Sequence, residues 1–283
     1  MRAWKYTMTT WTYTIALLPF GFVLSGATPS SPGQAAYERA NSLFVAMKLP
    51  EALAATEEAL RLDPKLVPAL TLKAKLAMGA YRLDVAHRCL EQALALDPKA
   101  PYAQFLYGLE AYLGNDLVEA LPRFRKARQL SPTDPRAALY LGLTVESLGQ
   151  PGEALSLYEE AVRLDRSAGE PHAEILLPGA RLLLLLGRLE ECDRWIRQAM
   201  KLLPNSRDVH FEFARLLLKK GDAVQSAAEG ETALGLSEGV VTDAAIHYLL
   251  IRAYRQGGMP DRAAVHAEVM RAQETPAGNK AKN

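Results

Sequence analysis

This sequence has few cysteines and few β-branched residues, and it has no large excess of basic residues. Only two of its 283 residues are cysteine, and 33 Lys and Arg residues nearly balance 32 Asp and Glu residues. No dense run of Lys or Arg occurs, so we expect no nucleic-acid binding through phosphate neutralisation. β-branched residues are sparse and no alternating strand pattern stands out. The chain should therefore be nearly all helical.

Motifs of catalytic and metal sites are also missing. The sequence has no Ser/His/Asp elbow, no phosphate-binding glycine loop and no zinc-ligand spacing. The five histidines show no His-x3-His pair: His87, His172, His210, His247 and His266. His247 and His266 could meet across the last helix pair, but partly exposed positions on helix surfaces are the favoured interpretation. We expect no enzyme activity, no metal and no small-molecule cofactor.

A step of 34 residues recurs through the first half of the chain. Gly108 recurs in this way as Gly142, and Phe124 as Tyr158. Four longer series share the step: Ala52, Ala86, Ala120 and Ala154; Ala59, Ala93, Ala127 and Ala161; Leu62, Leu96, Leu130 and Leu164; Pro64, Pro98 and Pro132. The alanines allow two antiparallel helices to approach closely, and each proline ends a helix. The pattern is typical of a protein built from repeated helix pairs.

This pattern resembles the tetratricopeptide repeat (TPR) family, which places Leu-Gly in a first helix, then an aromatic residue, Ala, Phe, Ala and a closing Pro over 34 residues. The resemblance implies an all-α, right-handed superhelical solenoid of antiparallel helix pairs. We expect about seven pairs over residues 35–273, four of which match the pattern closely. The family's first-helix Trp is absent. Arg166 replaces the fourth closing Pro, and Pro204 follows 38 residues later, which indicates four inserted residues around 169–173.

The fifth pair is the most irregular part of the repeat region. Pro178-Gly179 should bend or break its first helix. The leucine run 182–186 indicates burial on several sides. Cys192 replaces the small Ala of a second helix and should be buried. Cys89 lies three repeats away, which argues against a disulfide because each repeat touches only its neighbours.

The two ends of the chain differ from the repeat region. Residues 1–27 have two basic residues, an apolar run of about 14 residues and no acid, as in a secretory signal peptide; a transmembrane helix needs roughly 18–20 residues. An uncleaved anchor and an irregular soluble tail are the alternatives. We expect an exported bacterial protein, periplasmic or extracellular, which contacts a membrane only if this segment stays attached. Two free thiols count mildly against export. Residues 28–34 are interpreted as a linker, and 274–283 as a disordered tail.

In TPR proteins the first helices line a concave face where peptides commonly bind, and the resemblance implies the same here. The residues predicted to face or border this groove are Lys75, Tyr102, Phe105, Leu109, Tyr112, Arg136, Tyr140 and Leu143. The alternative is that several of them only pack between repeats, because their helical spacing by itself indicates an apolar face. One TPR subtype clamps a C-terminal carboxylate with Lys, Asn and Arg. This chain lacks the paired Asn residues, so that subtype is disfavoured.

The resulting hypothesis is a non-catalytic scaffold that binds other proteins or peptide segments in the groove. One alternative is a structural or assembly subunit of a bacterial cell-envelope or secretion complex, which would use its ends or convex face. A weaker alternative is an accessory domain of an enzyme system whose catalyst lies on another chain.

Overall fold

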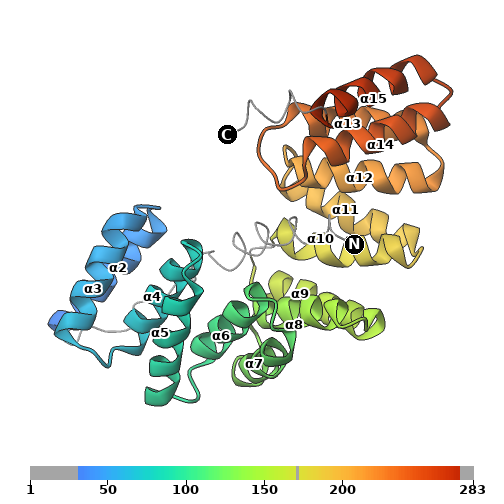
Figure 1. The fold of residues 1–283 in the computed structure, drawn as a ribbon. Helices are drawn as coiled ribbons and strands as arrows, with labels where there is room; N and C mark the ends of the chain where they lie inside the picture. Colours follow the sequence, from blue (N-terminus) through green and yellow to red (C-terminus); the bar gives the residue numbers. More distant parts are fainter. Residues whose placement is uncertain (1–30, 170–171, 275–283) are drawn as a thin grey trace. The chain divides into compact units, whose positions relative to one another are not determined.

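The computed structural model describes residues 31–169 and 172–274, and fourteen helices and no strand occur in this part of the chain (Figure 1). The helices are α2 (Pro32–Val45), α3 (Leu49–Leu62), α4 (Val67–Gly79), α5 (Leu83–Leu96), α6 (Pro101–Leu113), α7 (Leu117–Leu130), α8 (Pro135–Ser147), α9 (Pro151–Ser167), α10 (Ala173–Leu185), α11 (Leu189–Leu202), α12 (Arg207–Lys220), α13 (Ala223–Gly235), α14 (Asp243–Gln256) and α15 (Pro260–Glu274). Each even-numbered first helix packs on the odd-numbered second helix that follows it. The all-α fold and the seven pairs are confirmed.

Proline and short polar residues set where the helices begin. Four first helices have a proline in their first turn, at Pro32, Pro68, Pro101 and Pro135. An amide N–H has no partner there, so proline removes nothing. The Ser31 hydroxyl accepts a hydrogen bond from the backbone N–H of Gln34 at 3.2 Å. The first helix therefore begins inside the predicted linker, at residue 32 rather than 35.

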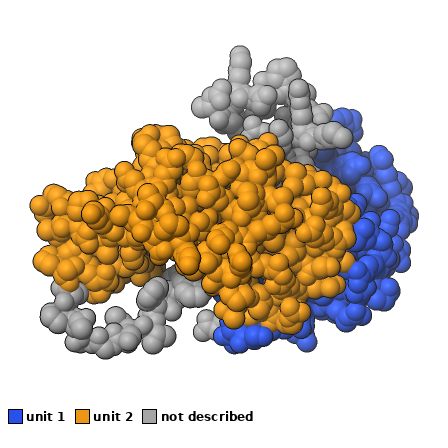
Figure 2. Space-filling model, turned by 90° about the horizontal axis from the view of Figure 1, so that it is seen from below, with its two compact units in different colours: residues 1–11, 165–283 blue, residues 12–164 orange. Residues whose placement is uncertain are grey.

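The chain divides into two compact units between Leu164 and Asp165 (Figure 2). The described residues of unit 2 are 31–164, and those of unit 1 are 165–169 and 172–274. The helix that crosses this boundary, α9, has 17 residues, whereas α3, α5 and α7 have 14 each. Arg166 stands where proline would have ended α9, so the helix continues to Ser167, just before the region of the predicted insertion.

Glycines on first helices allow aromatic rings of second helices to approach the backbone. A Cβ atom added to Gly108 would lie 2.9 Å from ring carbons of Phe124, and one added to Gly142 would lie 2.8 Å from Cε1 of Tyr158. Real Cβ atoms do not come this close to another carbon, so only glycine fits the two rings. The 34-residue repetition of these glycines therefore has a packing cause.

Of the predicted bend or break in the fifth pair, the break does not occur. The helix α10 continues through Pro178 and Gly179. Gly179 has a packing role instead, because a Cβ atom there would lie 2.1 Å from Cζ3 of Trp195 on α11. The indole therefore packs directly on the helix backbone beside the proline, which cannot donate a backbone hydrogen bond.

The leucine run at the end of α10 is buried only in part. Its first three residues are buried, but Leu185 is 73% exposed and Leu186 is 45% exposed. Both lie at the end of the helix, next to the turn at Gly187, whose φ is +75°. The predicted burial on several sides is therefore wrong for Leu185 and Leu186. Cys192 on α11 is fully buried, as expected, and both cysteines are free thiols.

The first helices lie on the inner side of each stack. Within unit 2, α4 contacts both α2 and α6, and α6 contacts α8; within unit 1, α12 contacts both α10 and α14. Among the described residues, neighbouring second helices are not packed on one another to the same extent. Helices on the inside of a curved stack are the ones that approach each other. We call the first-helix side of unit 2 its inner face.

Among the described residues no helix is both long enough and apolar enough to cross a bilayer. The predicted signal peptide, residues 1–27, lies outside the described residues. Of the predicted tail, 274–283, Glu274 is the last residue of α15 and the rest lies outside the described residues.

Candidate functional site

The predicted groove residues all lie on first helices of unit 2. Lys75 is on α4; Tyr102, Phe105, Leu109 and Tyr112 are on α6; Arg136, Tyr140 and Leu143 are on α8. Tyr102 and Leu143 are half-buried, and the other six are buried. The structure therefore places the predicted residues on three successive first helices of one unit. The exposure of their side chains differs.

Several of the aromatic residues form the packing between the third and fourth helix pairs. The ring of Tyr140 is fully buried and lies at centroid distances of 5.5 Å from Phe105, 5.6 Å from Phe124 and 6.2 Å from Tyr112. Edge and stacked contacts at these distances stabilise a core. Burial raises the pKa of Tyr112 to about 12. A partner could reach these rings only if the two pairs moved apart.

Lys75 is a buried cation among aromatic rings. Its Nζ atom lies 4.4 Å from the centroid of Phe44 on α2 and 6.0 Å from that of Tyr102, and only 5% of the residue is exposed. No carboxylate among the described residues forms a salt bridge with it. Burial, followed by the positive charge of Arg136, lowers the pKa of Lys75 to about 8.

Arg136 on α8 also lies against the Tyr102 ring and has its own carboxylate. Its Nε and Nη2 atoms donate to Asp134 at 3.0 and 2.7 Å. Its Cζ atom is 5.2 Å from the ring centroid of Tyr102 and 5.3 Å from that of Phe105. Burial raises the pKa of Tyr102 to about 12, so its hydroxyl stays protonated at neutral pH. The half-buried tyrosine therefore lies between two cations from neighbouring helices.

Sequence reasoning missed two members of this cluster. Phe44 occupies the repeat position of Tyr112, two steps of 34 residues earlier, so extending the series would have found it. Asp134 precedes Pro135 and caps α8, since its Oδ1 accepts the backbone N–H of Arg136 at 2.9 Å. The sequence identifies Asp134 as a helix cap but does not show that its carboxylate also neutralises Arg136.

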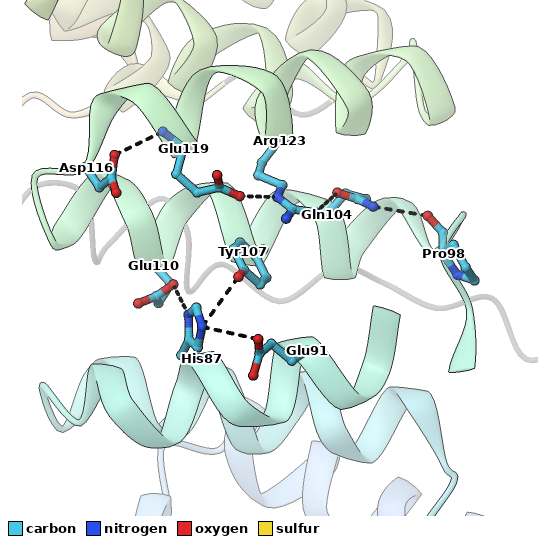
Figure 3. Close-up of polar contacts among 9 residues, drawn as sticks. All are labelled: His87, Glu91, Pro98, Gln104, Tyr107, Glu110, Asp116, Glu119 and Arg123. Atoms are coloured by element: carbon cyan, nitrogen blue, oxygen red, sulfur yellow. Dashed lines mark hydrogen bonds and ion pairs between the residues drawn. The ribbon is translucent and has the colours of Figure 1, made fainter. Parts of the chain in front are cut away.

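A second polar cluster joins the second and third helix pairs (Figure 3). Nδ1 of His87 lies 3.2 Å from a carboxylate oxygen of Glu110, and its Nε2 lies 3.6 Å from Glu91 and 3.5 Å from the Tyr107 hydroxyl. The guanidinium of Arg123 covers the Tyr107 ring at 4.2 Å. These contacts connect α5, α6 and α7 and are explained by packing. No group of three or more metal-ligating side chains is found in the described part of the chain.

Two histidine contacts in unit 1 correct the expectation of exposed histidines. His210, His247 and His266 are all buried. His210 Nδ1 lies 2.6 Å from Glu229, and the Nδ1 atoms of His247 and His266 lie 2.9 Å apart. Both contacts join a first helix to the second helix of the same pair, at the same separation in sequence. The favoured surface interpretation was therefore wrong for these three residues, while His87 and His172 are half-buried.

Comparison with known proteins supports the repeat assignment. The family model described as tetratricopeptide repeat matches residues 71–135 and 119–171. No curated protein matches the sequence.

The fold is similar to that of solved TPR structures. A tetratricopeptide repeat protein from Parabacteroides merdae has a TM-score of 0.59 at 16% identity, with 86% of this chain and 94% of that chain covered. YrrB, a TPR protein with an unusual peptide-binding site, has a TM-score of 0.53 at 20% identity, with 71% and 98% covered. A chain of the APC/C hetero-tetramer Cut9-Hcn1 has a TM-score of 0.60 at 18% identity; the match covers 83% of this chain but only 45% of that one. The family model covers residues 71–171, and the stacked helix pairs give the described residues the all-α helical repeat fold of the tetratricopeptide repeat structures.

Proposed function

We propose that the inner face of unit 2 binds a segment of a partner protein. The TPR fold supports a protein-interaction scaffold in general, and this face is where the first helices bring candidate contact residues together. The observation that carries the proposal is the position of Tyr102, a half-buried aromatic ring between two cations. An aromatic ring that is accessible and beside charged groups is a favourable anchor for a peptide.

The proposed contact residues are only part of the predicted groove residues, with one residue added. Phe105, Leu109 and Tyr140 are apolar side chains packed between helices, so the exposed part of the face belongs to the half-buried Tyr102 and Leu143. Lys75 and Arg136, which lie against Tyr102, and Phe44, which lies against Lys75, are also buried and complete the set through their cation–ring contacts. In this arrangement the buried rings hold the first helices at fixed positions. A preformed surface loses little conformational entropy when a partner binds.

The alternative function, an assembly subunit of a cell-envelope or secretion complex, would use other surfaces. Exposed apolar residues on second helices favour it: Val118 on α7 is 81% exposed and Val224 on α13 is 64% exposed. Export of the protein, directed by residues 1–27, remains part of both proposals.

Affinity capture with the full chain as bait separates the two functions. A Tyr102→Ser/Leu143→Ser variant changes two side chains of the inner face, and a Val118→Ser variant changes the outer side of the same unit. Circular dichroism would first show that all three chains have the same helicity. The proposal expects a specific protein that binds the parent and the Val118 variant but not the inner-face variant. Loss of that protein only from the Val118 variant contradicts it and favours assembly.

A further inference from the structure

The ammonium group of Lys75 has no carboxylate to pair with among the described residues. Removing an ammonium group from water without a counter-ion costs free energy, and buried charges in proteins are normally paired. Lys73, two residues away on α4, forms a salt bridge with Glu57 at 3.2 Å. Lys75 has no such partner among the described residues, and residues 1–30 contain neither Asp nor Glu.

Arg136 does not compensate for this charge. Its guanidinium is already neutralised by Asp134, and its own positive charge lowers the pKa of Lys75 further. The Phe44 ring offers the ammonium a favourable quadrupole at 4.4 Å, but this contact is weaker than a desolvated ion pair. The cluster therefore has two cations and one carboxylate.

We propose that Lys75 binds a carboxylate side chain, Asp or Glu, of the partner segment on the inner face of unit 2. The inference rests on the proposed function, because it states the chemistry of the segment that occupies that face. The rings of Phe44 and Tyr102 would contact the apolar atoms next to the carboxylate, which favours a protein segment over a free inorganic anion. A strongly perturbed, unpaired buried lysine is also more common at functional sites than elsewhere.

The test uses the full chain and a displayed library of random twelve-residue peptides. Peptides that bind the parent and are lost from Tyr102→Ser would be synthesised in pairs, with Asp or Glu in one member and Asn or Gln in the other. Affinities would be measured by fluorescence anisotropy against the parent, Lys75→Met, Lys75→Arg and the control Lys73→Met.

We expect the change from acid to amide to weaken binding to the parent and to Lys73→Met by about tenfold or more, which corresponds to about 1.4 kcal/mol or more. The same change should alter binding to Lys75→Met by less than about twofold, because the lysine that would pair with the acid is absent. Comparing the two effects is a double-mutant cycle, which isolates the energy of the Lys75–carboxylate pair. Lys75→Arg should keep the preference for the acidic peptide, since arginine also pairs with carboxylates.

The pH dependence of peptide affinity separates a binding role of Lys75 from a purely structural one, because a lysine that only supports the fold would not make the affinity depend on pH. A bound carboxylate should return the pKa of Lys75 from about 8 toward the ordinary value of 10.5. Affinity for the acidic peptide should therefore fall about tenfold or more between pH 7 and pH 9.5, by linkage. The amide peptide should show no such fall, and neither should the acidic peptide on Lys75→Arg.

Two results would overturn the inference. Equal acid-to-amide effects with and without Lys75 would contradict the carboxylate site while leaving the inner-face function intact. A library that yields no peptide sensitive to Tyr102→Ser would contradict the proposed function, and the carboxylate site with it.

Discussion

The Nδ1 atoms of His247 and His266 lie 2.9 Å apart inside the last helix pair. This contact is a hydrogen bond only if one Nδ1 carries a proton and the other does not. The second ring nitrogen of His266 lies 3.1 Å from Glu231, which also accepts a hydrogen bond from the Tyr254 hydroxyl at 2.8 Å. If both rings carried two protons, two N–H groups would face each other across this contact, so the contact requires that at least one ring is neutral.

The last helix pair should lose stability as the pH falls below about 6.5. Burial and then the charge of His266 lower the pKa of His247, while Asp243 and Glu231 partly oppose them and Arg207 adds to them. A folded-state pKa below the unfolded value of 6.5 means that the unfolded chain binds more protons below that pH. The stability contribution is therefore complete above pH 6.5 and decreases below it.

Urea unfolding followed by circular dichroism between pH 5 and pH 7.5 would measure this effect. A His247→Asn variant should show a smaller loss of stability over this range than the parent, because it lacks the titrating group. Equal pH slopes for the parent and the variant would show that the histidine pair does not titrate in this way.

Gly142→Ala should destabilise unit 2 by about 1–3 kcal/mol, because the new methyl group would overlap the Tyr158 ring. Gly152→Ala is the matched control, since Gly152 lies in the first turn of α9, with no atom within 4 Å of an added Cβ. Alanine is a better helix former, so the control should be neutral or stabilising by up to about 1 kcal/mol. Chemical denaturation of both variants tests the comparison, and equal destabilisation of the two would contradict the packing explanation.

The ammonium group of Lys75 should titrate near pH 8 in the unliganded chain. Lysine side-chain NMR with Lys75→Met as the assignment control would measure its pKa directly. Since the folded-state pKa lies below the ordinary 10.5, the folded chain is destabilised by this group as the pH falls from 10.5 to 8. At pH 7 Lys75→Met should therefore raise the free energy of unfolding, by on the order of 3 kcal/mol. A pKa near 10.5 for Lys75 would contradict both expectations.

Phe105→Ala should cost about 3–5 kcal/mol of stability, because this ring is 1% exposed and contacts Phe124 and Tyr140. Tyr102→Ala removes a half-buried ring from the same helix and should cost less. Thermal unfolding of the two variants would show which substitution costs more stability. If Tyr102→Ala were the more damaging, the division into buried core and accessible contact residues would be wrong.

Much of the fold was predictable because its packing rules repeat at a fixed interval. Ala120 and Ala154, both fully buried, mark where paired helices approach, and the 34-residue step places every pair up to α9. The irregular places were harder because local rules compete with tertiary packing. Pro178 is typical of a helix break, yet α10 is continuous there, and the adjacent Gly179 lies against the Trp195 ring of the next helix.

The candidate site was predictable in location but not in detail. The repeat position of Lys75 and Tyr102 places them on the inner face, but burial depends on neighbouring helices that the local sequence does not specify. Phe105 and Tyr140 have the same apolar periodicity whether they line a groove or fill a core. The missing counter-ion of Lys75 is invisible in the sequence, because it depends on which carboxylates the fold brings near.

Site-specific photo-cross-linking tests the central claim most directly. A photoreactive phenylalanine analogue would replace Tyr102 on the inner face of the full chain, or Val118 on the outer side of the same unit, in the cells that produce the protein. The account predicts that the analogue at position 102 captures a discrete partner protein and the one at 118 does not. Capture of that protein only from position 118 would contradict binding at the inner face.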